Sequence, residues 1–338
     1  ARWRPHVKTA KLAATMRELV AQGVKQFKCA TTLELKVACE TGAEDVLIAF
    51  PMRAANARRA ADIARRHPRA RVSALVEDAP GVAEWGGEVG LFWDLNPGMD
   101  RTGAALDLAA LEAGLAAMRE HGSEFRGLHY YDGHLGSLAP AERMAAAQRG
   151  YDELVALAKA LERDGQTVGE IVTAGTPALP CSLAHAGLRS GAWTHRVSPG
   201  TVVYNDVTSL EQLPEAYGYR PAALVLARVV SRPAAQIVTC DAGHKAVSAD
   251  CGVPNCVALG HPELRGLKPS EEHLPWAVAE GEAGPRRGEL LRLLPRHVCP
   301  TVNNFDHALW IEGGRVQRVE SVTARGHDAP LGEAAGES

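Results

Sequence analysis

Over the first 200 or so residues, stretches of two different apolar periodicities alternate. Apolar residues at helical spacing predict helices over residues 8–23, 31–43, 54–68, 106–122 and 140–165. Short apolar runs predict strands over 24–30, 45–50, 71–77, 89–96, 125–132 and 169–175, with a last one starting at 195. Such alternation predicts a parallel sheet covered by helices. Six or seven strands in this length favour a (β/α)8 barrel of the TIM type over a doubly wound sheet.

The pattern changes after Asp206. Helical periodicity almost vanishes, and short strands with polar turns are predicted over residues 221–232, 235–243, 289–299, 307–314 and 315–326. This indicates an antiparallel β domain. We therefore predict an α/β barrel over residues 1–210 and a C-terminal β domain over 211–330. A loose, small and polar tail is predicted over 331–338.

Composition excludes several classes of function. The 338 residues are 46% hydrophobic and 23% charged, which is typical of a globular protein. A net charge of −3 gives no reason to expect a nucleic acid or an anionic membrane as partner. No apolar run reaches the roughly 18 residues of a membrane span. Seven cysteines, an odd number, without a visible signal peptide indicate reduced thiols and a cytoplasmic location.

Two glycine-containing turns follow the late strands of the predicted barrel. Thr173, Gly175 and Thr176 form one turn, and Gly200 with Thr201 forms the other. Small residues let backbone N–H groups approach an anion, and hydroxyls add donors. Two adjacent turns at this place match the usual phosphate site of a barrel, although ordinary Gly/Thr turns have the same composition.

Lys8 follows "RPHV", where a strand is expected to end. A lysine in the mouth of a barrel can be desolvated, which lowers its pKa and leaves a neutral amine. A neutral amine can form a Schiff base with an aldehyde cofactor. The alternative for any single lysine is a solvated surface position.

His297 and Cys299 lie two residues apart in "LLPRHVCPTVNNFD". On an extended strand, residues i and i+2 point to the same side, so both could face one site. The spacing alone leaves three interpretations open: metal ligands, a catalytic couple, or two buried side chains.

The motifs taken in order resemble one family. "RPHVKTAK" resembles the cofactor-lysine motif of the D-threonine aldolase and D-serine dehydratase family, pyridoxal-phosphate enzymes of the alanine-racemase-like fold. "PGMDRTG" resembles its arginine turn, and "YYDGH" its strand-end tyrosine motif. "VTAGTP" and "SPGTVVYND" resemble its two phosphate-side turns, and "PRHVCPT" its C-terminal metal motif.

The resemblance implies a role for each matching residue. Lys8 would be the Schiff-base lysine, Arg101 would face the phenolic edge of the cofactor, and Tyr131 would lie beside the ring or the substrate. The phosphate side would be held by Thr173, Gly175, Thr176, Gly200 and Tyr204. His297 and Cys299 would bind a divalent metal.

The implied reaction is lyase chemistry on 3-hydroxy D-amino acids. The position of Cys299 is commonly Asp in the family's aldolases and Cys in its zinc-dependent D-serine dehydratases, whereas the following "PTVNNFD" is closer to the aldolases. A thiolate with an imidazole favours zinc, and with it dehydration, over D-threonine-type aldol cleavage. An amino-acid racemase or a non-catalytic pyridoxal-phosphate-binding protein is a more distant alternative. The family also implies a homodimer.

Overall fold

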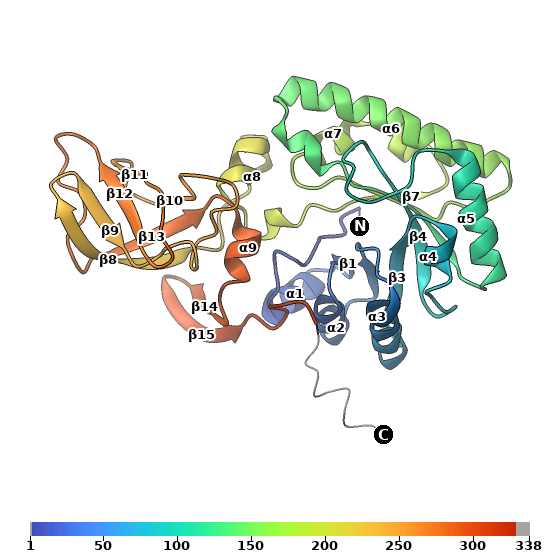
Figure 1. The fold of residues 1–338 in the computed structure, drawn as a ribbon, viewed down its shortest axis with the longest axis horizontal. Coiled ribbons are helices and arrows are strands. Elements are labelled where there is room, and N and C mark those ends of the chain that lie inside the picture. The colour runs from blue at the N-terminus through green and yellow to red at the C-terminus, as the bar shows by residue number, and fades with distance from the viewer. Residues whose placement is uncertain (1, 329–338) are drawn as a thin grey trace. The chain divides into compact units, whose positions relative to one another are not determined.

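The computed structural model describes residues 2–328 and divides into two compact units (Figure 1). Within the described chain, the first unit comprises residues 2–200 and 326–328, and the second comprises residues 201–325. The tail predicted over 331–338 lies outside the described residues. None of the helices in the described part is both long and apolar enough to cross a membrane.

Seven parallel strands form the sheet of the first unit, in the order β1-β2-β3-β4-β5-β6-β7. Their bounds are Gln26–Cys29 (β1), Asp45–Ile48 (β2), Arg71–Val76 (β3), Gly90–Leu95 (β4), Phe125–Tyr130 (β5), Glu170–Thr173 (β6) and Thr194–Val197 (β7). The α-helices of this unit are Ala13–Ala21 (α1), Thr32–Glu40 (α2), Ala54–Arg66 (α3), Ala79–Val82 (α4), Leu108–Glu120 (α5), Pro140–Arg163 (α6) and Leu179–Ala184 (α7). A helical connection separates each strand from the next, as parallel pairing requires.

The segment before α1 closes this sheet. Trp3 forms a parallel bridge with Val197 of β7, and His6 forms one with Lys28 of β1. The backbone N–H of Arg4 donates to the Val197 carbonyl (2.9 Å), and that of Lys28 donates to the carbonyl of Pro5 (2.9 Å). This closing segment, residues 3–7, therefore takes the place of an eighth strand. The predicted barrel is confirmed.

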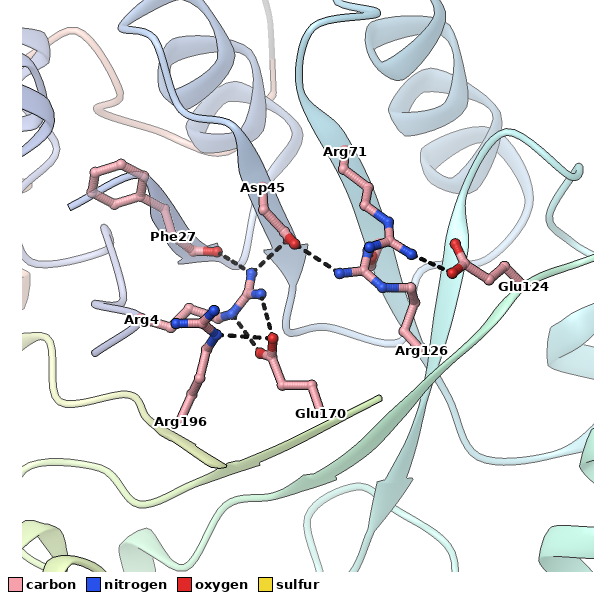
Figure 2. Close-up of polar contacts among 9 residues, drawn as sticks. Arg4, Phe27, Asp45, Arg71, Glu124, Arg126, Glu170 and Arg196 are labelled. Atoms are coloured by element: carbon pink, nitrogen blue, oxygen red, sulfur yellow. Dashed lines mark hydrogen bonds and ion pairs between the residues drawn. The ribbon is translucent and has the colours of Figure 1, made fainter. Parts of the chain in front are cut away.

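Arg4 anchors the closing segment from inside the barrel and is completely buried. Its Nη1 donates to Asp45 Oδ1 (2.8 Å), while Nε and Nη2 donate to the two carboxylate oxygens of Glu170 (2.9 and 3.1 Å). Arg126 donates to Asp45 Oδ2 (2.7 Å), and Arg196 donates to Glu170 Oε2 (2.9 Å). Figure 2 shows Arg4 between the two carboxylates. Because Asp45 and Glu170 begin β2 and β6, the network lies where the strands start.

The second unit is antiparallel, as predicted. Its six-stranded sheet has the order β10-β13-β8-β9-β12-β11, and β14 pairs with β15. The strands are Val225–Ala234 (β8), Ile237–Cys240 (β9), Cys256–Ala258 (β10), Leu264–Gly266 (β11), Leu274–Val278 (β12), Leu290–Pro295 (β13), His307–Glu312 (β14) and Arg315–Ser321 (β15). Two short helices are Val207–Gln212 (α8) and Val298–Val302 (α9). Fully buried Trp276 packs in the core of this unit.

Two predicted elements have different ends in the structure. The helix expected from Lys8 begins only at Ala13, because Lys11 has a φ of 36° that no α-helix accommodates. The strand expected through Cys299 ends at Pro295, and His297 is instead the N-cap residue of α9. Cys299 is therefore in the first turn of a helix, and the extended geometry assumed for the His297–Cys299 pair was wrong.

We predict that Asp45→Asn destabilises the protein by about 3 kcal/mol at neutral pH, because Arg4 and Arg126 would lose a buried counter-charge. Burial alone would raise the pKa of Asp45, but the two guanidinium groups outweigh it and hold the pKa below its ordinary value. The carboxylate therefore stabilises the fold at neutral pH, and this contribution is lost as the pH falls through the lowered pKa.

Urea denaturation followed by circular dichroism at pH 7 and at several acidic pH values measures both effects. The variant should show a smaller acid-induced loss of stability than the natural protein. Asp62→Asn is the matched control, because Asp62 contacts only Arg65 at the exposed surface among the described residues. Equal free energies of unfolding for the Asp45 and Asp62 variants would contradict the role assigned to the network.

Candidate functional site

Lys8 directly follows the closing segment, at the end opposite to Arg4. It follows residues 3–7, which run parallel to the other strands, so it stands at the carboxyl edge of the barrel. Its backbone N–H donates to His6 Nδ1 (3.2 Å), and its side chain is half-buried. Lys11 is engaged differently, in a buried ion pair with Glu34 (2.9 Å). Lys8 is thus placed where barrel enzymes carry their chemistry.

A second lysine lies inside the barrel beside Lys8. Lys28 of β1 is 2% exposed, and its Nζ is 3.4 Å from His129 Nε2. Burial, together with the nearby charge of Lys8, lowers the pKa of Lys28 to about 7. Among the described residues no carboxylate forms an ion pair with Lys28, although Arg4 pairs with two carboxylates and Lys11 with one. Lys28 is therefore an unusually weak base.

His129 connects Lys28 to a carboxylate. Its Nδ1 lies 2.7 Å from Asp94 Oδ1, and the hydroxyl of Thr102 donates to Asp94 Oδ2 (2.9 Å). Burial and the nearby Lys28 lower the pKa of His129. Asp94 and His129 lie on neighbouring strands β4 and β5, so the sheet register brings the pair together.

Tyr131 and Arg101 come together at the same edge of the barrel. The Arg101 guanidinium carbon is 4.8 Å from the centre of the Tyr131 ring, and Lys28 Nζ is 5.4 Å from it. Both distances are within the range of cation–π attraction. A small cavity beside them is lined by Asp94, Pro97 and Met99, among others. Two residues predicted from separate motifs therefore share one site.

The late-strand turns at residues 173–176 and 198–200 meet one another. The backbone N–H of Ser198 donates to the carbonyl of Thr173 (3.0 Å). A Cβ added to Gly175 would lie 2.8 Å from the Tyr131 ring, and one added to Gly200 would lie 2.5 Å from the His6 carbonyl oxygen. Only glycine fits these two positions without a shift, so both turns approach the barrel mouth closely.

The hydroxyls of these turns differ in their bonding. Thr173 Oγ1 contacts Ser182 Oγ (2.7 Å) and His195 Nε2 (2.9 Å), so it is already engaged within the fold. Thr176 Oγ1 and Ser198 Oγ are buried and have no hydrogen-bond partner among the described residues. Buried polar atoms are seldom left unpaired, so these two are candidates to hold a ligand anion.

Asp132, next to Tyr131, is the buried carboxyl on this side. Its Oδ2 accepts a hydrogen bond from the Tyr151 hydroxyl. Burial raises the pKa of Asp132 to about 6. Its hydrogen bond with Tyr151 braces the strand end, and its charge partly offsets the lowering of the Lys28 pKa.

Tyr204, predicted for the phosphate side, belongs to the second unit. Its side chain is buried, and its carbonyl accepts from the Ala222 backbone N–H (2.7 Å). The next residue, Asn205, has a φ of 53° and a buried amide without a partner in the described chain. The roles predicted for Gly200 and Tyr204 remain predictions.

His297 has three polar neighbours within the second unit. Its Nδ1 lies 2.6 Å from Asp250 Oδ2 and 3.7 Å from Cys251 Sγ. Suitable ligand atoms of Asp250, Cys251 and His297 all lie within 4.8 Å of one another, an arrangement that could hold a metal ion. Burial alone would lower the pKa of His297, but hydrogen bonds with Cys299 and Asp250 raise it to about 9. His297 thus contacts its predicted partner and two others.

Sequence reasoning missed several of these residues. The sequence did contain a signal for Lys28. A lysine between Phe27 and Cys29, in a short apolar strand, is a candidate for an unusual buried charge. No such signal pointed to Asp250 and Cys251, since Cys251 and His297 are 46 positions apart in the sequence. Only the folded chain brings them together.

Comparison with known proteins places this site in a family. Residues 222–311 match the model of a putative serine dehydratase domain. A D-threonine aldolase from Arthrobacter sp. is 25% identical over 330 residues, covering 96% of this chain and 85% of that protein. A 3-hydroxy-D-aspartate aldolase from Paracoccus denitrificans (strain Pd 1222) is 27% identical over 273 residues, covering 76% and 67%.

Comparison with solved structures leads to the same family. The crystal structure of D-threonine aldolase from Filomicrobium marinum has a TM-score of 0.85 and 30% identity, covering 96% of this chain and 88% of that one. An alanine-racemase-like protein from Idiomarina loihiensis, at 17% identity and a TM-score of 0.76, shares the fold alone. The chain therefore belongs to the D-threonine aldolase and D-serine dehydratase family of pyridoxal-phosphate-dependent lyases.

Proposed function

We propose that this protein dehydrates 3-hydroxy D-amino acids of the D-serine type with the help of pyridoxal phosphate and a divalent metal. The observation that carries the choice of reaction is the thiol of Cys299 hydrogen-bonded to His297. Imidazole with thiolate is a donor set for zinc rather than for magnesium or manganese. We therefore propose zinc as the ion, held by His297 and Cys299.

The residues of the first unit fit pyridoxal phosphate. Buried hydroxyls of Thr176 and Ser198 without partners can donate to its phosphate, beside the glycine turns at Gly175 and Gly200. Lys8, Lys28 and Arg101 supply positive charge for an anionic ligand, and the charges of Lys8 and Arg101 both depress the pKa of Lys28. Thr173 would support the phosphate turn through Ser182 and His195.

When bound, pyridoxal phosphate supplies an electron sink for a bond broken at the Cα of the amino acid. Lys8 Nζ would hold it covalently and, once released by the substrate, would accept the Cα proton. Arg101 would donate to the phenolic edge of the ring, and Tyr131, whose ring lies near both Arg101 and Lys28, would lie against the cofactor ring or the substrate.

The β-hydroxyl needs a Lewis acid, because hydroxide is a poor leaving group. A metal at His297 and Cys299 would polarise that hydroxyl. Loss of hydroxide after removal of the Cα proton would leave an enamine. Its imine tautomer would be hydrolysed by water to a keto acid and ammonia. Deprotonation of the same hydroxyl instead leads to cleavage between Cα and Cβ. The same donor set can thus serve either outcome.

Aldol cleavage of the D-threonine type is the second candidate. It is favoured by the names of the relatives that are 25–30% identical to this chain, which are aldolases. Cys299 argues the other way, because a harder carboxylate stands there in the family's aldolases.

We further propose a homodimer in a reducing, cytoplasmic compartment. The exposed side chains of Leu309, Ile311, Val316 and Val319 on the β14–β15 hairpin support a second copy as partner. The seven cysteines are all free thiols, which supports the compartment.

Product analysis tests the proposed reaction. Purified protein loaded with pyridoxal phosphate and zinc should release pyruvate and ammonia from D-serine faster than glycine and acetaldehyde from D-threonine. Cys299→Asp should shift this ratio toward aldehyde by at least about tenfold, since a carboxylate ligand changes the ion that is bound. Acetaldehyde as the main product of the natural protein would select the aldolase instead.

We predict that Lys28→Met stabilises the cofactor-free protein on the order of 1–3 kcal/mol at pH 6–7. Folding lowers the pKa of Lys28 from 10.5 to about 7. The free-energy cost of burying its charge therefore has its full value below pH 7. The cost fades as the pH rises toward the ordinary value, so the gain should shrink near pH 10. Urea denaturation across this pH range measures the difference.

Lys159→Met is the control, because Lys159 is exposed on α6. It should leave the free energy of unfolding unchanged at every pH. A Lys28→Met variant that is less stable than the natural protein at pH 6 would contradict the assignment of Lys28 as a buried amine without an ion-pair partner in the described chain.

A further inference from the structure

The loop that contains Asp250 and Cys251 is fixed beside His297 by hydrogen bonds. The Thr301 hydroxyl donates to the His297 carbonyl (2.8 Å) and accepts from the backbone N–H of Ser248 (3.2 Å). Ser248 Oγ in turn donates to Asp250 Oδ1 (2.7 Å). Helix α9 and the loop are therefore tied through a single hydroxyl, and their relation does not depend on a bound ion.

The spacing of the donors can be compared with that around a zinc ion. With Zn–S of about 2.3 Å and Zn–N of about 2.0 Å, tetrahedral ligands N and S lie roughly 3.6 Å apart. Cys251 Sγ lies 3.7 Å from His297 Nδ1 and 3.6 Å from Asp250 Oδ2. Both separations involving the thiol therefore already suit a shared ion.

The third separation is shorter. His297 Nδ1 and Asp250 Oδ2 are 2.6 Å apart, which is a charge-assisted hydrogen bond rather than the roughly 3.3 Å expected for two oxygen and nitrogen ligands. Asp250 is exposed, so its side chain can turn away by the roughly 0.7 Å that a shared ion would need. The same carboxylate can thus orient the imidazole or enter the coordination shell.

We propose that Cys251 is a ligand of the divalent ion held by His297, with Asp250 beside it. This inference rests on the proposed metal dependence and extends its ligand set. Two protein ligands are few for zinc, whereas catalytic zinc sites usually have three and keep one position open. Cys251, His297 and Asp250, whose ligand atoms lie within 4.8 Å of one another, would give three donors with room for a substrate hydroxyl. A second thiolate also raises the preference for zinc over magnesium and manganese.

The experiment compares the natural protein with Cys251→Ser, each as the full chain loaded with pyridoxal phosphate. Zinc affinity is measured by competition with a chromophoric chelator, and sulfur ligands are counted by zinc X-ray absorption. Cys251→Ser should bind zinc at least about tenfold more weakly and should lose one sulfur scatterer at about 2.3 Å. Because Cys251 is exposed, the variant should retain the natural circular dichroism spectrum.

Two controls separate this inference from the proposed function. Cys39→Ser removes a thiol of the first unit and should change neither measurement. Cys299→Ser tests the proposed ligand pair independently. Unchanged affinity and sulfur count in Cys251→Ser, with a loss in Cys299→Ser, would overturn the inference and leave the proposed function intact. A natural protein that binds no zinc would overturn both.

Discussion

Closure of the barrel by Arg4 is the constraint on which the first unit depends. The closing segment is held at the start of the strands by the buried guanidinium of Arg4, which lies between Asp45 and Glu170. Lys8 lies four residues after Arg4. At roughly 3.3 Å per residue, this distance brings it to the carboxyl edge of the barrel. An ion-pair network at one end of the barrel thus fixes the position of the proposed catalytic amine at the other.

The carboxyl edge has the opposite electrostatic character. The carboxylates near Lys28 are already engaged, Asp94 by His129 and Thr102, and Asp132 by Tyr151. Lys8, Lys28 and Arg101 form no ion pair among the described residues, and Lys28 is the buried one of the three. The charges of Asp94 and Asp132 only partly offset the lowering of its pKa. Burial of unbalanced positive charge is costly unless an anion is bound. A cofactor with a phosphate and a phenolic oxygen meets this requirement, which is why pyridoxal phosphate suits the geometry as well as the family.

Local pattern was sufficient to predict the architecture. Strand–helix alternation predicted the barrel, and the change of periodicity after Asp206 predicted the antiparallel unit. The ends of the elements were less predictable, because they depend on tertiary contacts. Lys11 has a left-handed backbone conformation, and His297 is the N-cap of α9. At this helix start the Asp206 carboxylate accepts a hydrogen bond from the Val298 N–H (2.9 Å). The site was only partly predictable for the same reason. Single motifs contain Lys8, Arg101 and Tyr131, whereas the Lys28–His129–Asp94 chain comes from three separate strands.

We propose that Lys8, and not the neighbouring Lys28, forms the covalent bond to the cofactor. Reduction of the pyridoxal-phosphate-loaded protein with borohydride, followed by peptide mass spectrometry, tests it directly. We expect one phosphopyridoxyl group on the peptide that contains Lys8, and none on the peptide that contains Lys28. A label on Lys28, or a protein that acquires no label at all, would contradict it.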